Sequence, residues 1–398
     1  MRVLVQKFGG TSVHTPHARC RALAHVMRAV EAGYRVLVVV SAMGRSGHPY
    51  ATDTLLALAR GVWPTGPPDE LDLLLSCGEL IACVVVANSF RRGGLDRVVV
   101  LSGPQAGIIT DDGHGDARIV EVRPETVLHH LHQGYVVVVA GFQGTTRSGK
   151  ITTLGRGGSD TTAAALAAAV GAELIEIYTD VDGVRTADPR VVPEAGAVPH
   201  LTYDEAWLLA SSGMRIVHPR AIRLAATHRL PIRVRGNFSE DEGTLIDHRH
   251  PSCSAPSAVK AIAHRERVSL AYLIYDDRVG SRQKPTQALR GLSCGMVDPS
   301  GCMLCTGAYP SGAWAEALAT AGWRLALERP CAEATAVGYR LAEEPELPLA
   351  AYRDLRTAAV ETLAMYHTPL YIRFAVAAAD LTRALRVLHR TFGLTTQT

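Results

Sequence analysis

The chain has 398 residues, of which 47% are hydrophobic and 20% are charged. This length allows about two or three domains, and the composition is that of a globular rather than a disordered protein. Lysine and arginine number 41 against 38 aspartate and glutamate, so the formal charge is +3. Such a small and dispersed excess does not predict nucleic-acid binding.

Membrane and secretion signals are also missing from the sequence. No apolar run approaches the roughly 20 residues that span a bilayer. The first residues, MRVLVQKFGG, reach glycines too early for a signal peptide. Eight cysteines are scattered through the chain, which is typical of free thiols in a reducing compartment. We therefore expect a cytoplasmic protein without membrane or nucleic-acid partners.

The first 235 residues alternate short valine-rich runs with longer helical stretches. The runs, expected as strands, are 2–8, 35–41, 97–101, 135–140, 173–179 and 231–234. The expected helices are 16–33, 70–93, 124–132, 159–170, 203–212 and 219–229. Several runs are apolar at consecutive positions, as in strands covered on both faces. The alternation predicts an α/β fold with a mainly parallel sheet in an αβα sandwich.

Composition changes after this region. Residues 236–257 are polar and rich in glycine, proline and serine, so we expect the first domain to end at residue 240 and a linker to occupy 241–257. Residues 258–398 show shorter signals. We expect strands at 323–328, 334–339 and 370–376 and helices near 348–365 and 378–391. This pattern predicts two small α+β units.

A lysine and two glycines end the first predicted strand, in Lys7-Phe8-Gly9-Gly10. Glycines let the backbone approach a bulky anion, and the N–H groups that follow can point at it. Lys7 adds a mobile positive charge. The pattern fits a phosphate site, and it also fits a simple turn.

A second glycine-rich turn, GRGGSDTT, spans residues 155–162 and leads into an alanine-rich helix. In one interpretation Ser159 or Asp160 is the N-cap of that helix. In the other, anionic ligand groups lie at the helix N-terminus and Arg156 binds a carboxylate. Asp160 beside a phosphate would have to orient a lysine or a metal ion. Because Lys7 lies on a neighbouring strand, we favour the ligand site.

Further polar groups follow other predicted strands. The strand at 173–179 ends in Thr179-Asp180 and turns through Asp182-Gly183, at the strand end where open α/β sheets bind ligands; the same composition also fits a plain turn. Ser41 follows another strand. Neither a Walker phosphate loop nor a well-placed G-x-G-x-x-G occurs, which argues against the two common nucleotide-binding folds.

One acid lies inside an apolar helical stretch, in Ser76-Cys77-Gly78-Glu79. A buried glutamate is costly unless it has a partner or contacts a ligand. If the helix instead exposes Glu79 to solvent, the residue carries no functional meaning. Both interpretations stay open at this point.

Together these segments resemble the aspartate kinases of the amino acid kinase superfamily. The motifs KFGGTSV, VVVSAMG, SCGE, GFQGTT, GRGGSDTTAAAL, TDVDGVRTADPR and IVHPRA occur in that family's order over about the first 235 residues. The segment RSGHPYATDTLL after SAMG is most similar to the Bacillus-type, diaminopimelate-sensitive aspartokinases.

The resemblance implies transfer of the γ-phosphoryl group of ATP to the β-carboxylate of L-aspartate, giving 4-phospho-L-aspartate and ADP. This reaction opens the biosynthesis of lysine, diaminopimelate, threonine and methionine. The carboxylate, with a solution pKa of about 3.9, is ionised at neutral pH and needs no general base. Positioning and charge neutralisation must then supply most of the acceleration, with Mg²⁺ bridging the phosphates and few direct protein ligands.

The resemblance also assigns roles to residues. Lys7 and Asp160 are the expected catalytic pair, in which Asp160 orients Lys7. The expected aspartate contacts are Ser41, Thr52, Glu79, Arg156 and Ser159, with Arg156 on a carboxylate and Glu79 on the α-amino group. The expected ATP contacts are Lys7, Gly9, Gly10, Ser12, Thr179, Asp180, Asp182, Arg190 and Arg215. Arg215 stands where the family usually has lysine, which keeps the charge but changes the geometry.

In this family the C-terminal region carries two ACT domains, which pair between subunits and bind an inhibitory amino acid. Residues 334–338 and 370–394 resemble the second of these domains. The effector loop usually has a Pro-Gly pair, whereas this chain has Glu344-Pro345-Glu346-Leu347. We therefore expect a homodimer formed through divergent ACT-like domains, with weakened or altered feedback control by an amino-acid effector.

Two alternatives accompany this hypothesis. The first is another kinase of the same fold, acting on acetylglutamate, glutamate or uridylate, and the C-terminal extension and the SAMG and SCGE segments argue against it. The second is a catalytically inactive protein that senses amino acids. The intact set of Lys7, Glu79, Arg156 and Asp160 argues against the second.

Overall fold

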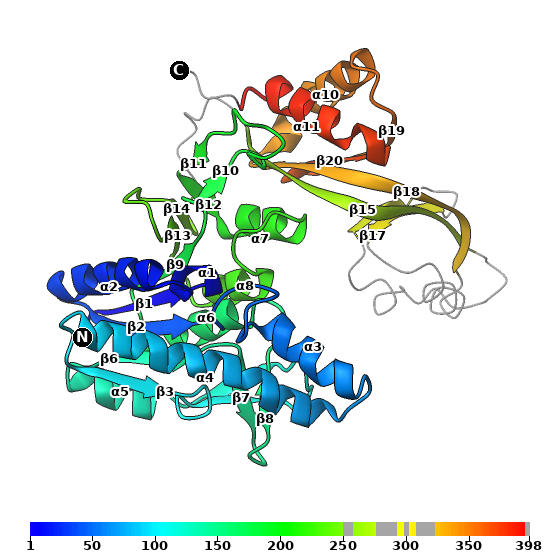
Figure 1. The fold of residues 1–398 in the computed structure, drawn as a ribbon. Helices are drawn as coiled ribbons and strands as arrows, with labels where there is room; N and C mark the ends of the chain where they lie inside the picture. Colours follow the sequence, from blue (N-terminus) through cyan, green and yellow to red (C-terminus); the bar gives the residue numbers. More distant parts are fainter. Residues whose placement is uncertain (250–257, 276–292, 298–301, 308–322, 395–398) are drawn as a thin grey trace. The chain divides into compact units, whose positions relative to one another are not determined.

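The computed structural model describes residues 1–249, 258–275, 293–297, 302–307 and 323–394 (Figure 1). The chain forms two compact units. The first contains Met1–Val184, Ala197–Trp207 and Arg215–Pro251, and the second contains Arg185–Gly196, Leu208–Met214 and Ser252–Thr398. Both units are therefore discontinuous in sequence, which a single boundary at residue 240 does not describe.

An eight-stranded sheet forms the centre of the first unit. In spatial order its strands are β12 (His200–Thr202), β14 (Thr244–Asp247), β13 (Ile232–Gly236), β9 (Leu174–Thr179), β1 (Val3–Phe8), β2 (Arg35–Val40), β6 (Val136–Ala140) and β3 (Val98–Leu101). All neighbours are parallel except β13 and β14, which are antiparallel. The expected mainly parallel sheet is thus confirmed.

Helices cover both faces of this sheet (Figure 1). Helices α2 (Pro16–Glu31) and α4 (Pro68–Arg92) pack through one apolar cluster onto alternate side chains of β1, β2 and β6. Helices α5 (Glu125–His132) and α6 (Gly158–Val170) lie against the other face, and α8 (Pro219–Thr227) packs on α6. Because both faces are covered, β2 and β6 are apolar at consecutive positions, as the sequence predicts.

The predicted strands and helices of the first 235 residues all occur, to within two residues at each end. Several elements were not predicted. They are α1 (Gly10–Val13), α3 (Thr52–Val62), a small sheet of β5 (Ile119–Val122), β4 (Ile108–Thr110), β7 (Gln143–Thr146) and β8 (Ile151–Thr153), and the pair β10 (Val184–Arg185) and β11 (Ala197–Val198). Strand β14 lies inside the range 241–257, for which the composition indicates a linker. Its short apolar core is masked by the surrounding polar residues.

Among the described helices, α4 is long and apolar enough to cross a membrane by length and composition. The expectation that no apolar stretch reaches that length is therefore too strict. Half (50%) of its most apolar window is buried inside the protein. It also carries the buried carboxyl side chains of Asp72 and Glu79. These features are typical of a core helix.

The second unit contains a six-stranded antiparallel sheet. In spatial order its strands are β16 (Ser293–Val297), β17 (Cys302–Gly307), β15 (Val259–Tyr275), β18 (Trp323–Gly338), β20 (Tyr371–Val376) and β19 (Thr362–His367). Helices α10 (Glu346–Thr357) and α11 (Leu381–Thr391) pack with β15, β18 and β20 in one apolar cluster. Short 3₁₀ turns occur at Leu341–Glu343 and Ala378–Asp380.

Two expectations for this region are wrong in detail. The separate strands expected at 323–328 and 334–339 are parts of the single strand β18. The helix expected near 348–365 ends at Thr357, and β19 follows after a turn in which Ala359 has a φ of 53°. Apolar spacing alone does not separate the end of a helix from an edge strand that follows closely.

A buried ion pair joins strands of this second sheet. Glu333 of β18 is fully buried, and its Oε1 lies 3.2 Å from Nε of Arg373 on β20. Arg373 also donates a hydrogen bond to the hydroxyl of Ser212 at 3.3 Å. Arg265 of β15 donates to the carbonyl of Ser211 at 2.6 Å. These bonds fasten the end of α7 (Tyr203–Ser211) and the residue that follows it to the sheet.

Candidate active site

The carboxyl ends of three parallel strands bring the predicted polar turns together. Phe8 at the end of β1 is paired with Val40 of β2 on one side and with Tyr178 of β9 on the other. The turns that begin at Gly9, at Ser41 and after Tyr178 therefore leave the sheet side by side. This edge is the usual ligand-binding position of open α/β sheets.

The Gly-Gly turn after β1 is shaped by close backbone packing. The N–H of Gly9 donates to the carbonyl of Tyr178 at 3.2 Å. A Cβ at Gly10 would lie 2.4 Å from the carbonyl oxygen of Ala42, so only glycine fits there. Ser12 is 1% exposed and its hydroxyl donates to the Tyr178 carbonyl at 3.4 Å. In this state Ser12 supports the turn from inside.

Lys7 and Asp160 form an ion pair at this edge. The Nζ of Lys7 lies 2.6 Å from Oδ1 of Asp160, and the two side chains are only 13% and 12% exposed. The second oxygen, Oδ2, accepts a hydrogen bond from the backbone N–H of His218 at 3.1 Å. Asp160 is thus held by a cation on one side and an amide on the other. This geometry suits a carboxylate that fixes the position of a lysine.

The glycine-rich turn 155–158 delivers Asp160 to this position. Gly157, with a φ of 67°, is the N-cap of α6, and no side chain caps the helix. The N-cap interpretation of Ser159 or Asp160 is therefore wrong, because both residues lie in the first helical turn. A Cβ at Gly157 would lie 2.1 Å from Cγ of His218. Ser159 is buried beside Gly141.

Glu79 is buried in α4, with 2% of its surface exposed, so the exposed-helix interpretation is wrong. Its Oε1 accepts a hydrogen bond from the backbone N–H of Ala42 at 3.1 Å. Its Oε2 has no hydrogen-bond partner among the residues that the structure describes. Burial raises the pKa of Glu79 to about 8, and the Ala42 N–H offsets only part of this effect. A buried carboxyl oxygen without a partner is rare in folded proteins, and a hydrogen-bond donor beside it would satisfy it.

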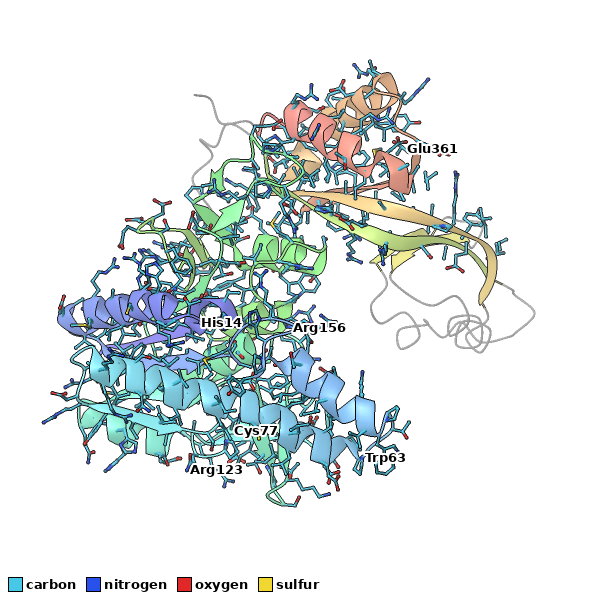
Figure 2. The ribbon with its side chains drawn as sticks, in the orientation of Figure 1. His14, Trp63, Cys77, Arg123, Arg156 and Glu361 are labelled. Carbon is cyan, nitrogen blue, oxygen red and sulfur yellow. The ribbon has the colours of Figure 1, made fainter. Side chains whose placement is uncertain are left out.

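The other expected aspartate contacts are more open. Arg156 (Figure 2) is exposed in the turn before α6, and its guanidinium has no hydrogen bond or ion pair with any described residue. Ser41 follows β2 and is half-buried. Thr52 is the first residue of α3 and is also half-buried. Arg156 can therefore meet a carboxylate without giving up an existing partner.

The expected nucleotide contacts after β9 form their own small network. The hydroxyl of Thr179 donates to Oδ1 of Asp180 at 3.0 Å, and Arg45 forms an ion pair with the same carboxylate. Burial acts to raise the pKa of Asp180, but these two partners outweigh burial and the pKa lies below its ordinary value. Asp182 is half-buried, and a Cβ at Gly236 would lie 2.1 Å from its Oδ1.

The two arginines expected at the nucleotide lie in different units. Arg215 belongs to the first unit, is exposed, and has no hydrogen bond or ion pair with a described residue. Arg190 belongs to the second unit, where its guanidinium donates to both carboxylate oxygens of Asp188. Arg190 therefore belongs to a different unit from the other expected site residues, and its contact with the nucleotide stays a prediction.

Three groups at the site were not singled out from the sequence. They are the N–H of Ala42, the backbone and ring of His218, and Phe142, whose φ of 68° is unusual for a residue with a side chain. Burial lowers the pKa of His218, so its neutral Nδ1 accepts a hydrogen bond from the N–H of Arg220 at 3.3 Å. The motif IVHPRA contains this histidine, but the motif alone does not show that its backbone meets Asp160.

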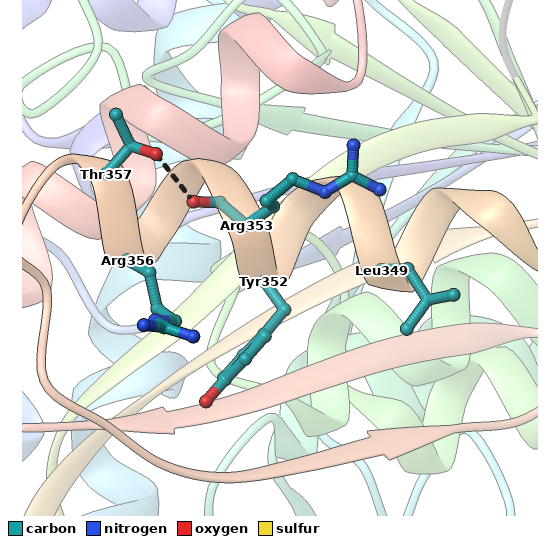
Figure 3. A pocket seen from close by; sticks show the side chains of 5 residues that line it. All are labelled: Leu349, Tyr352, Arg353, Arg356 and Thr357. Atoms are coloured by element: carbon teal, nitrogen blue, oxygen red, sulfur yellow. Dashed lines mark hydrogen bonds between the residues drawn. The ribbon is translucent and has the colours of Figure 1, made fainter.

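One surface hollow, of about 500 Å³, lies elsewhere, along α10 in the second unit (Figure 3). It is lined by Leu349, Tyr352, Arg353, Arg356 and Thr357. All five residues come from a single helix. The hydroxyl of Thr357 donates a hydrogen bond to the carbonyl of Arg353 at 2.9 Å. The hollow brings no residues of different elements together, unlike the edge of the first sheet.

Comparison with known proteins identifies the family of this chain. Residues 2–236 match the Amino acid kinase family. The chain is 40% identical over 407 residues to aspartokinase 1 of Bacillus subtilis, an alignment that covers 99% of this chain and 100% of that protein. It is 36% identical over 413 residues to the aspartokinase of Thermus thermophilus, with 99% of each chain covered.

The fold also matches that of a solved structure, E. coli aspartokinase III in complex with aspartate and ADP. The TM-score is 0.82, with 23% identity and coverage of 98% of this chain and 100% of that one. The chain therefore belongs to the amino acid kinase family. Within that family it is one of the aspartokinases, the kinases that phosphorylate aspartate.

Proposed function

We propose that this aspartate kinase transfers the γ-phosphoryl group of ATP to the β-carboxylate of L-aspartate at the edge formed by β1, β2 and β9. The observation that carries this proposal is the ion pair of Lys7 and Asp160, which is largely shielded from solvent at the end of the central strand β1. A fixed positive charge at this position is what the attack of an anionic carboxylate on an anionic phosphate requires.

At the phosphate end of the site, Lys7 stabilises the charge on the transferring group and Asp160 holds the lysine in position. The turn at Gly9 and Gly10 lets the backbone approach the phosphates closely. The aspartate carboxylate is already ionised at neutral pH, so the site needs no general base. The role of these residues is therefore positioning and electrostatic stabilisation.

At the aspartate end, Glu79 and Arg156 supply complementary charges. The unpartnered Oε2 of Glu79 accepts a hydrogen bond from the substrate α-ammonium group. Arg156 binds a substrate carboxylate, for which its planar guanidinium is well suited. Ser41, Thr52 and Ser159 provide secondary contacts around this pair.

At the nucleotide end, Thr179, Asp180, Asp182 and Arg215 contact ATP, whereas the assignment of Arg190 to ATP rests on the family resemblance alone. Mg²⁺ would enter as part of the substrate MgATP, in which the phosphate oxygens would supply most of its ligands. Bound there, the ion would neutralise phosphate charge. The residues that the structure describes include no group of three or more His, Cys, Asp or Glu side chains that could hold a metal ion.

We further propose that the second unit pairs two chains into a homodimer through ACT-like modules and that the enzyme acts in the cytoplasm, at the start of lysine, threonine, methionine and diaminopimelate synthesis. The antiparallel sheet with α10 and α11 on one side supports an ACT-like second module. Glu344 and Glu346, beside Pro345 where the family's loop usually has Pro-Gly, support weakened or altered feedback by an amino-acid effector. Inhibition by millimolar lysine, threonine or diaminopimelate would contradict this last proposal.

Acceptor selectivity tests the proposed reaction. ATP-dependent ADP release is measured with L-aspartate, L-glutamate and N-acetylglutamate as alternative acceptors at equal concentration. We expect release with aspartate alone, because Glu79 and Arg156 hold both ends of one amino acid of fixed length. Equal or faster release with glutamate or N-acetylglutamate would contradict aspartate as the substrate.

A further inference from the structure

The start of helix α8 contacts the candidate active site at Asp160 and at Leu154. The proposed reaction gives these contacts no role. The helix begins at Pro219, after His218. The backbone N–H of His218 donates to Oδ2 of Asp160 at 3.1 Å, as described. Two residues later, Arg220 reaches the opposite side of the glycine-rich turn. One helical turn thus meets the segment 154–160 at two points.

Arg220 is bound at both ends of its guanidinium fork. Its Nη1 donates to the backbone carbonyl of Leu154 at 3.1 Å, and its Nη2 donates to Oδ2 of Asp116 at 2.8 Å. Asp116 is itself packed on the turn, because a Cβ at Gly155 would lie 2.4 Å from its Oδ1. Arg220 and Asp116 therefore contact the turn at Leu154 and Gly155, just before Arg156.

The turn depends on such external contacts, because its own backbone is permissive. Gly155 and Gly157, on either side of Arg156, both have positive φ, at 69° and 67°. Glycine has no side chain that would restrain its backbone. The Arg156 side chain is exposed and has no described partner, so its position is set only by the backbone that carries it. The imidazole of His218 closes the other side against Gly157.

We propose that Arg220, together with His218, is a positioning residue of this enzyme, which fixes the turn 154–158 so that Arg156 meets the substrate carboxylate and Asp160 meets Lys7. Arg220 touches neither substrate, since its fork is occupied by Leu154 and Asp116. This inference rests on the proposed roles of Arg156 and Asp160. It assigns to the IVHPRA motif a role in aspartate binding, through the bond between its arginine and the turn.

Steady-state kinetics of Arg220→Ala test this role. We expect the KM for aspartate to rise at least about tenfold, because small displacements of a positioning group are costly, while the KM for ATP changes less than about twofold. A merely structural residue would change neither constant selectively. Arg220→Lys keeps the charge but cannot serve both the carbonyl and the carboxylate as a fork, so we expect an intermediate KM for aspartate.

Arg223→Ala is the matched control. Arg223 lies on the same helix, but its guanidinium stacks on the ring of Trp207, 4.4 Å from the ring centroid, and does not touch the turn. We expect this variant to keep both KM values. A folded Arg220→Ala enzyme with the same KM for aspartate as Arg223→Ala would overturn the proposal. Where Arg220→Ala does not fold, an unchanged KM for aspartate in Arg220→Lys overturns it equally.

Hydrogen exchange of the ligand-free protein provides a readout that does not need activity. The amides of residues 155–161 should exchange faster in Arg220→Ala than in the wild type, and Arg223→Ala should leave them unchanged. Equal exchange in all three proteins would contradict the positioning role. If the wild-type protein is inactive but its amides still exchange faster after Arg220→Ala, the proposed function is contradicted. The role of Arg220 in fixing the turn 154–158 then still stands.

Discussion

The ammonium of Lys7 lies 2.6 Å from the carboxylate of Asp160, and this contact joins the end of the central strand β1 to the first turn of α6. The same carboxylate is held from behind by the backbone of His218. Strand, helix and connecting loop therefore meet at one charge pair. The proposed phosphoryl transfer depends on this arrangement.

Removing either member of the pair should abolish most of the activity. We expect Lys7→Ala and Asp160→Ala each to lower kcat at least about a hundredfold, because electrostatic groups aimed at the transferring charge contribute a few kcal/mol. Lys150→Ala is the control, since Lys150 forms an exposed ion pair with Asp69 and lies outside the site. Initial rates of ADP release measure all three variants. Near-normal kcat in either site variant would show that the pair is structural.

The buried carboxyl of Glu79 should make stability depend on pH. Its pKa is about 8 in the folded chain, against an ordinary value of 4.5. Between these values the unfolded chain releases the proton while the folded chain retains it, so rising pH favours unfolding. The stabilisation is complete below pH 4.5 and is lost as pH rises toward 8, by at most about 1.4 kcal/mol per pH unit.

Glu79→Gln supplies the comparison for this prediction. The free energy of unfolding of the wild type minus that of Glu79→Gln should fall between pH 5 and pH 8, as followed by urea unfolding at about five pH values. Saturating aspartate should weaken this dependence in the wild type, because the α-ammonium group favours the ionised carboxylate. Parallel curves for the two proteins would mean that Glu79 ionises normally.

The two left-handed glycines at the ends of α6 should respond differently to alanine. At Gly157, a Cβ would collide with His218, whereas at Gly171, with a φ of 64°, nothing lies within 4 Å. We expect Gly157→Ala to lose aspartate phosphorylation. Gly171→Ala should lose about 1 kcal/mol of stability through backbone strain and keep its activity. Kinetics and thermal unfolding of both variants check this, and retained activity in Gly157→Ala would show that the turn tolerates movement of His218.

The ion pair of Glu333 and Arg373 should matter for the stability of the second unit. Arg373→Met leaves the Glu333 charge buried, and breaking such a pair costs about 3–5 kcal/mol. Arg329→Ala, which removes an exposed ion pair with Glu361, should cost less than about 1 kcal/mol. Calorimetric unfolding distinguishes the two variants. Equal small losses would indicate that water reaches Glu333 readily.

Much of the first unit could be predicted from the sequence because its signals are local. Strands buried on both faces are apolar at consecutive positions, and glycines mark the turns at Gly10 and Gly157, where backbone or ring atoms come close. The resemblance assigned Lys7 and Asp160 as a catalytic pair; the two side chains do form an ion pair, and their catalytic role stays a prediction. What the pattern did not show were contacts made by the backbone, such as those of Ala42 and His218.

The second unit was harder to predict for a different reason. Its long strands β15 and β18 pair with each other over most of their length, so their limits depend on partners distant in sequence. The short strand β14 is similarly defined by its neighbours β12 and β13 rather than by its own composition. Propensity is a weak guide wherever pairing decides the structure.

Trapping the product with hydroxylamine tests the central claim most directly. The labile acyl phosphate is converted to a hydroxamate, which is measured in the presence and absence of ATP, Mg²⁺ and L-aspartate, with Lys7→Ala in parallel. We predict aspartyl hydroxamate from the wild type only when all three are present, and almost none from Lys7→Ala. No hydroxamate from a wild-type protein that still binds ATP would contradict the account and favour a catalytically inactive, amino-acid-sensing protein.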